Sequence, residues 1–233
     1  MSGEMTAPLA LISSMATRQI LSRLASEYES ETGQTVRVES VGGVDAARRV
    51  SEGEAFDIVV LGSDALAKLA QQGHVDAGSR ADVARSGIAA AVAADARQPR
   101  IDTEEALRDA ILQSRSIGYS TGPSGVHLEK LFARWGIADT IAPKIVQARA
   151  GLPVATLIAR GEVELGFQQN SELLDQPGIA ILGPLPEQAQ AVTVFAAALC
   201  AKSSRGDAVK AFLSFLVSPR TRAVKLAHGM EPA

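Results

Sequence analysis

Small hydroxylated residues and glycines gather at three points of this 233-residue chain where an apolar run passes into a helical pattern. The richest point is the stretch Tyr119-Ser-Thr-Gly-Pro-Ser-Gly125, and Ser13-Ser14 and Gly42-Gly43 follow two earlier apolar runs. The first amides of a helix have no carbonyl partner within it, and its dipole places about half a positive charge there. Glycine allows a ligand to approach the backbone, and hydroxyls add donors. The three turns therefore predict a site for a small anion.

The same turns have a purely structural interpretation. Serine and glycine at a strand-to-helix turn often only cap the helix. Asp45, in the first turn of the helix after Gly43, would also compete with an anion. Arg18, Arg48 and Arg49 are candidates to face the anion, and exposed helix faces explain them equally well. On the residues alone, both interpretations stay open.

Two further polar segments belong with the turns. Gly151-Leu-Pro-Val154 introduces a helix with proline in its first turn, and Gly166-Phe-Gln-Gln169 ends an apolar strand in two amides. Paired glutamines are uncommon in a core, and they can donate to an oxyanion or accept from a hydroxyl. Polar contacts in a hinge are the alternative.

Other chemistries find no support in the residues. Gly122-Pro-Ser-Gly125 matches neither a nucleotide P-loop nor a Gly-x-Ser-x-Gly nucleophile elbow. The three histidines carry no metal-ligand spacing, so we predict no metal and no cofactor. Cys200 sits in an apolar run and is predicted to be a small core residue.

Composition limits the class of partner. A formal net charge of -3 and a pI near 5.7, without a basic run, argue against nucleic acid. No stretch approaches the roughly 18 consecutive apolar residues of a membrane span, so we expect no membrane insertion. The N-terminus lacks a signal-peptide pattern, which predicts a cytoplasmic protein as written, or a periplasmic one if a leader was removed.

Apolar runs alternate with amphipathic stretches throughout, which predicts an α/β fold of parallel strands and crossover helices. Strands are predicted at residues 9–13, 35–39, 56–61, 87–94, 116–119, 145–148, 164–168 and 190–201. Helices are predicted at residues 16–31, 44–51, 64–72, 106–112, 124–135, 154–160, 208–217 and 221–227. The pattern repeats in two doubly wound halves, predicted as lobe 1 (residues 1–85 and 190–233) and lobe 2 (residues 86–189), joined by two hinge crossings.

The residues in this order resemble the molybdate-binding-protein-like branch of the periplasmic solute-binding proteins. The resemblance rests on Ser13-Ser14, Gly42-Gly43, the 119–125 stretch, Pro153-Val154 and Gly166-Phe-Gln-Gln169. It implies two α/β lobes of the type II periplasmic-binding class, closing on an anion held by neutral hydroxyls and amides. The ligand-binding residues expected from the turns and from this resemblance are Ser13, Ser14, Gly42, Gly43, Ser120, Thr121, Ser124, Gly125, Val154, Gln168 and Gln169.

The sequence departs from the molybdate pattern at two places. Gln168-Gln169 fall where a tyrosine usually completes the molybdate site, and glycine stands at 42 and 43 where a serine hydroxyl is expected. The same branch includes aconitate isomerases, which are similar in the serine-glycine turn, in Gly166-Phe-Gln-Gln169 and in Ser171-Glu-Leu-Leu174. An isomerase of that kind would need carboxylate anchors, which Arg18 and Arg48 could supply, and one general base. Glu39, Asp45, Tyr119 and His127 are the candidates for that base.

Two functions follow as hypotheses. The first is a two-lobed binding protein for a small oxyanion or polycarboxylate, which would deliver its ligand to an ABC permease. The second is an aconitate-isomerase-like enzyme that transfers a proton on a tricarboxylate.

Overall fold

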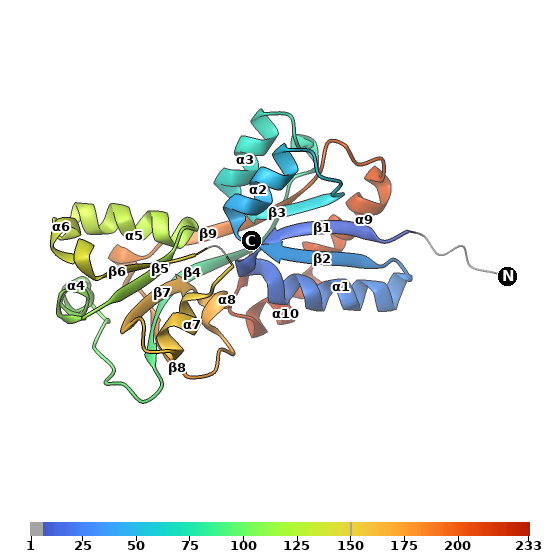
Figure 1. The fold of residues 1–233 in the computed structure, drawn as a ribbon. Helices are drawn as coiled ribbons and strands as arrows, with labels where there is room; N and C mark the ends of the chain where they lie inside the picture. The colour runs from blue at the N-terminus through green and yellow to red at the C-terminus, as the bar shows by residue number, and fades with distance from the viewer. Residues whose placement is uncertain (1–6, 150) are drawn as a thin grey trace. The chain divides into compact units, whose positions relative to one another are not determined.

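A computed structural model describes residues 7–149 and 151–233, in which the chain forms two α/β units (Figure 1). Unit 1 contains the chain up to Arg85 and again from Val194 to Ala233, and unit 2 contains Ser86–Thr193. The chain passes from unit 1 to unit 2 within strand β4 (Ala81–Ala93) and returns within β9 (Val192–Leu199). The α/β class predicted from the sequence is confirmed.

Unit 1 is built on a mostly parallel sheet. Strand β1 is parallel to β2 and β3, and β9 is antiparallel to β3, in the order β2-β1-β3-β9. The short strand β10 pairs with the beginning of β4. The elements not yet given bounds are β1 (Leu9–Ser14), β2 (Val36–Val41), β3 (Ile58–Gly62), β10 (Glu231–Pro232), α1 (Arg18–Thr32), α2 (Gly43–Ser51), α3 (Ser63–Gln71), α9 (Gly206–Leu216) and α10 (Arg222–Ala227).

Both faces of the unit 1 sheet are covered. Leu9 and Leu11 of β1 share one buried cluster with residues of α1 and α9, whereas Ile12 belongs to a second cluster with residues of α2 and α3. This split follows from the strand geometry, because successive side chains point to opposite faces. Ser13 therefore lies on the α1 face, and Ser14 lies on the α2 face.

Unit 2 repeats the arrangement on a smaller scale. Its strand order is β8-β4-β7-β5-β6, with β5 parallel to β6 and β7, and β4 antiparallel to β7 and β8. One buried cluster packs under α4, α5 and α6, and another packs under α7 and α8. The bounds are β5 (Ile117–Ser120), β6 (Ile145–Ala148), β7 (Leu165–Gln169), β8 (Ile179–Pro184), α4 (Glu104–Gln113), α5 (Pro123–Arg134), α6 (Ala138–Ile141), α7 (Val154–Ala159) and α8 (Asn170–Leu173).

The predicted strands miss three features of the sheets. Strand β4 begins at Ala81, ahead of the strand predicted at residues 87–94, and β8 and β10 were not predicted. Each of these segments is held by a partner distant in sequence: Arg85 pairs with Glu231, and β8 pairs with residues 89–93 of β4. Short edge strands depend on such partners more than on local propensity.

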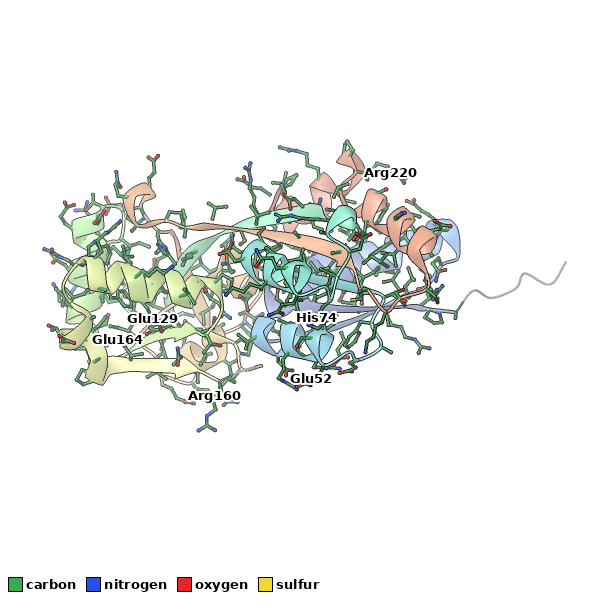
Figure 2. The ribbon with its side chains drawn as sticks, turned by 90° about the horizontal axis from the view of Figure 1, so that it is seen from above. Glu52, His74, Glu129, Arg160, Glu164 and Arg220 are labelled. Carbon is green, nitrogen blue, oxygen red and sulfur yellow. The ribbon has the colours of Figure 1, made fainter. Side chains whose placement is uncertain are left out.

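Charged side chains lie mainly on the surface, and Glu52, Arg160 and Arg220 are exposed (Figure 2). Among the residues that the structure describes, the buried exception is Lys225 of α10, whose Nζ donates to the carbonyl oxygen of Leu216 at 2.7 Å. Burial lowers the pKa of Lys225 to about 8. In residues 7–149 and 151–233, no helix combines the length and the apolar character needed to cross a membrane.

Candidate ligand-binding turns

The turn after β1 contains two serines in different situations. Ser13 faces its register partner Ser40 of β2, and the two hydroxyl oxygens lie 2.8 Å apart in a hydrogen bond. The hydroxyl of Ser14 is buried and has no hydrogen-bond partner among the described residues. A buried hydroxyl without a partner costs free energy, so a ligand or water that bonds to Ser14 would be stabilising.

Helix α2 begins beside Ser14. A Cβ atom built on Gly43 would lie 3.6 Å from Cβ of Ser14, which places the first residue of α2 against that side chain. Gly42 precedes the helix as its N-cap, and the first amide bonded within the helix is that of Ala46. The amides of the first three helical residues therefore have no intrahelical acceptor and can donate to an anion.

The arginines of α2 are engaged elsewhere. Arg48 forms ion pairs with Asp45 and Glu52, and Arg49 forms ion pairs with Glu39 and Glu54. For both arginines these contacts raise the pKa of the guanidinium, chiefly through the hydrogen bonds. Of the two interpretations open in the sequence, the structure favours a solvated helix face, and the expectation that Arg48 anchors a carboxylate is not supported. Arg18 is exposed at the start of α1.

Two serines of unit 1 were not among the predicted ligand-binding residues. Ser40 holds Ser13, as described, and Ser63 is the first residue of α3. The Ser63 hydroxyl donates to the Val194 carbonyl oxygen at 3.1 Å and accepts from Arg80. The signal was present, because Leu61-Gly-Ser63 repeats the strand, glycine, serine, helix layout of the other turns.

In unit 2, the turn between β5 and α5 is tightly packed. Ser124 and Gly125 are buried in the first turn of α5, and their amides have no acceptor within the helix. A Cβ atom on Gly125 would lie 1.7 Å from the carbonyl oxygen of Ser120. Glycine is therefore required there for the helix to pack on the strand. Ser120 accepts a long hydrogen bond of 3.4 Å from the Gly122 amide, and Thr121 is exposed.

The two glutamines at the end of β7 lie on opposite faces of the sheet. Gln168 accepts a hydrogen bond from the Val154 amide at 3.0 Å and donates to Oε1 of Glu172 at 2.8 Å. Two residues predicted as ligand donors, Val154 and Gln168, are thus bonded to each other. Gln169 donates through Nε2 to the Thr193 hydroxyl at 2.8 Å, and its Oε1 is buried without a partner among the described residues. The hydroxyl of Ser171 is likewise buried without a hydrogen-bond partner among the described residues.

The candidates for a general base are all engaged in other contacts. Glu39 and Asp45 are in the ion pairs of α2, and His127 donates from Nε2 to the Ala189 carbonyl oxygen at 2.8 Å. Tyr119 is buried in the unit 2 core, where burial, and secondarily the charge of Glu129, raise the pKa of its phenol. A raised pKa keeps the phenol neutral and unsuited to accept a proton. The carboxylate that sequence reasoning missed is Glu172, which is half-buried and bonded to Gln168.

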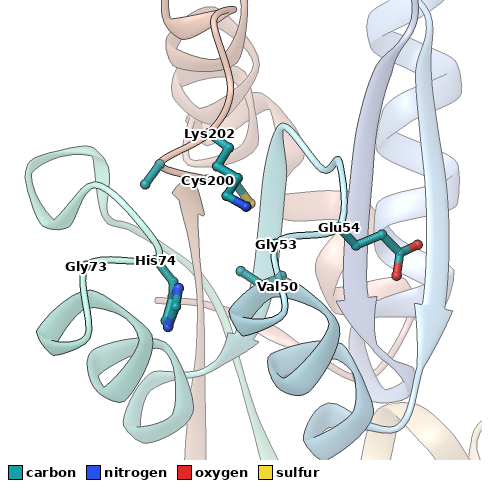
Figure 3. Close-up of a pocket in the computed structure, with 8 residues that line it drawn as sticks. Val50, Gly53, Glu54, Gly73, His74, Cys200 and Lys202 are labelled. Carbon is teal, nitrogen blue, oxygen red and sulfur yellow. The ribbon is translucent and has the colours of Figure 1, made fainter.

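A separate pocket lies on unit 1, away from the donor turns (Figure 3). Gly53 and Glu54 of its lining precede β3, whereas the donor turns follow the carboxyl ends of their strands, so it lies at the opposite end of the unit. Burial, helped by the charge of Asp57, raises the pKa of Cys200 to about 12. Cys200 is therefore a core residue, as predicted, and not a nucleophile. The pocket is lined by Val50, Gly53, Glu54, Gly73, His74, Cys200, Ala201 and Lys202.

Within the described residues, no group of three or more His, Cys, Asp and Glu side chains is placed to hold a metal ion. The donors present are hydroxyls, backbone amides and side-chain amides, which suit an anionic oxygen ligand better than a cation.

The fold and these turns define an α/β protein of the type II periplasmic-binding class. Among solved structures, the periplasmic molybdate-binding protein of Azotobacter vinelandii is similar with a TM-score of 0.80 at 20% identity, covering 95% of this chain and 98% of that one. The sulfate-binding protein SubI of Mycobacterium tuberculosis H37Rv is similar with a TM-score of 0.76 at 14% identity, covering 98% of this chain and 88% of that one.

The sequence comparisons give the family. A family model described as "Bacterial extracellular solute-binding protein" matches residues 9–231, and the chain belongs to that family. Among curated proteins, an aconitate isomerase of a Pseudomonas species is 34% identical over 230 residues, which cover 96% of this chain and 87% of that protein. The resemblance predicted from the turns is thereby confirmed.

Proposed function

We propose that this protein acts on a small tricarboxylate of the aconitate type and interconverts its isomers. The observation that carries the proposal is the 34% identity to the Pseudomonas aconitate isomerase, which extends over nearly the whole chain. A tricarboxylate also suits the donors at the turns, because carboxylate oxygens accept hydrogen bonds from amides and hydroxyls.

The binding step rests on neutral donors. Each unit offers such donors at its own turns: unit 1 has the first amides of α2 and the hydroxyl of Ser14, and unit 2 has the amides of Ser124 and Gly125. The nearby guanidinium groups of Arg48 and Arg49 are neutralised by carboxylates of the chain. The helix N-termini supply the positive potential instead.

The chemical step needs one base. In such an isomerisation the base removes a proton from a methylene carbon, the double bond migrates, and the conjugate acid returns the proton to the distal carbon. We assign this role to Glu172, because its carboxylate is half-buried after the carboxyl end of β7 and accepts a hydrogen bond from Gln168 there. The hydrogen bond from Gln168 orients the carboxylate, as second groups orient catalytic bases elsewhere.

The experiment is to incubate the purified protein with cis- or trans-aconitate and follow the isomer ratio by proton NMR. A rate that scales with protein concentration is expected. Glu172→Gln keeps an acceptor for Gln168 but cannot take a proton, so turnover should fall at least about 100-fold while ligand affinity changes little. Glu129→Gln, which removes an exposed carboxylate of the same unit, is the matched control and should keep wild-type turnover.

Two results would contradict parts of the proposal. Unchanged turnover in Glu172→Gln would remove Glu172 from the mechanism and leave the activity intact. No turnover by the wild-type protein, at any concentration, would reject the isomerase.

A second candidate function is a receptor that binds an oxyanion or polycarboxylate without converting it and passes it to an ABC permease. The family match over residues 9–231 favours it. A receptor of this kind would work outside the inner membrane, and cell fractionation tests that location. Thermal shift with molybdate, tungstate, sulfate and tricarboxylates identifies the ligand, because a ligand that binds only the folded state raises the midpoint. Tight molybdate binding without aconitate turnover would favour the receptor over the enzyme.

A further inference from the structure

The position of Gln169 follows from the sheet register of unit 2. Strands β5 and β7 are parallel, with Ile117 beside Leu165 and Gly118 beside Gly166. Because parallel strands run in the same direction, the carboxyl end of β7 at Gln169 and the carboxyl end of β5 at Ser120 lie at the same end of the sheet. Gln169 therefore lies at the end of the sheet where the chain enters α5.

The face of the unit 2 sheet on which the Gln169 side chain lies also follows from the strand. Leu165 and Phe167 belong to the buried cluster that packs under α5, together with Leu128 and Phe132 of that helix. Gln169 has the same parity along β7, so its side chain lies on the α5 face. The first amides of α5, at Ser124 and Gly125, are donors at this same end.

The hydrogen bonds of Gln169 show which of its side-chain atoms lacks a partner and whether that atom is a donor or an acceptor. Its side-chain nitrogen is used by Thr193, and only 1% of the residue is exposed. The remaining atom, Oε1, is a pure acceptor and has no partner among the described residues. A carbonyl oxygen repels an ionised carboxylate or oxyanion oxygen, so the partner it lacks must be a donor.

We infer that Gln169 determines specificity by accepting a hydrogen bond from an O–H group of the ligand. The ligand class is then a polycarboxylate that carries such a group, either an alcohol hydroxyl or an un-ionised carboxyl. A fully ionised tetraoxyanion does not satisfy Gln169. This inference rests on the proposed function, since it takes an acidic ligand at the α5 turn as given.

Gln147 provides the control. It is exposed on β6 of the same unit and carries the same amide. A Gln147 variant therefore loses the same atoms without changing the side-chain oxygen of Gln169.

The test is isothermal titration of the full chain with citrate and with tricarballylate, which differ by one hydroxyl, at pH 7.5, and with tricarballylate again at pH 5.5. If the O–H is an alcohol, the wild-type protein binds citrate at least about 10-fold more tightly than tricarballylate. If it is an un-ionised carboxyl, tricarballylate binds at least about 10-fold more tightly at pH 5.5. Gln169→Met, which is nearly isosteric and lacks the amide, abolishes the preference, and Gln147→Met retains it.

A second variant at the same position controls for misfolding of Gln169→Met. Gln169→Glu keeps an acceptor at this position, so it is expected to retain the preference of the wild-type protein. The inference is overturned if polycarboxylates bind with neither preference, or if the preference survives in Gln169→Met. If no polycarboxylate binds at all, the proposed function falls and this inference falls with it, whereas binding without a preference overturns the inference alone.

Discussion

The two units carry similar strand-to-helix turns but bury different polar groups. In unit 1 the buried polar side chains are hydroxyls and the ammonium of Lys225, and in unit 2 they are hydroxyls and the amides of Gln168 and Gln169. Unit 1 leaves room for a side chain at Gly43, whereas unit 2 leaves none at Gly125. Turns with the same sequence layout therefore differ in packing. The turn of unit 1 tolerates a Cβ atom at Gly43, whereas the turn of unit 2 does not tolerate one at Gly125.

The largest effect on stability is expected from substitution of Gly125, and Gly43 serves as the comparison. Gly125→Ala would place a methyl group 1.7 Å from the Ser120 carbonyl oxygen, so α5 must move away from β5. We expect a loss of about 3 kcal/mol or more in the free energy of unfolding, measured by urea denaturation. Gly43→Ala makes only an ordinary contact of 3.6 Å and should change stability by less than about 0.5 kcal/mol. Equal losses in both variants would remove the contrast between the units.

The next effect concerns the buried ammonium of unit 1. The pKa of Lys225 is lowered from 10.5 to about 8 on folding, so between these pH values the unfolded chain binds more protons than the folded one. Stability contributed by this group therefore rises with pH from about 8 to about 10.5, by about 1–3 kcal/mol. The difference in unfolding free energy between the wild-type protein and Lys225→Met isolates the rise, since other titrating groups are common to both. A difference that does not vary across this window would contradict the assigned burial.

The smallest effect separates the two serines of β1. Ser14→Ala removes a hydroxyl that has no partner in residues 7–149 and 151–233, so the free protein should keep its stability or gain slightly, while ligand affinity falls about 10-fold. Ser13→Ala breaks the bond to Ser40 and should lower the free energy of unfolding by about 1 kcal/mol. Denaturation and titration of both variants decide this. The assignment of Ser14 to the ligand fails if its removal leaves affinity unchanged.

Much of the fold was predictable from periodicity alone. Most helices and parallel strands lie within a few residues of their predicted ranges, because buried strands and amphipathic helices leave strong local patterns. The start of β4 and the strands β8 and β10 were missed, since their partners, such as Glu231 for Arg85, are distant in sequence.

The candidate site was predictable as a set of turns but not in its bonding. The sequence places Gln168 and Gln169 side by side, and strand geometry sends them to opposite faces. It also offers Arg48 as a carboxylate anchor and His127 as a base, whereas the folded chain bonds these to Asp45 and to the Ala189 carbonyl. Such pairings depend on which helix face packs against which loop, and the local sequence pattern does not predict that.

By itself, the sequence determined the α/β alternation, the turns where donors gather and the neutral character of those donors, because each depends on residue type and on spacing within a few positions. Tertiary structure alone decided which polar atoms remain unsatisfied. Within the part of the chain that the structure describes, Ser14 and Gln169 each keep one polar atom without a partner, while Ser13 and Gln168 do not. The physical reason is that a hydrogen bond requires two atoms within about 3 Å, and for these residues the second atom comes from another segment of the chain.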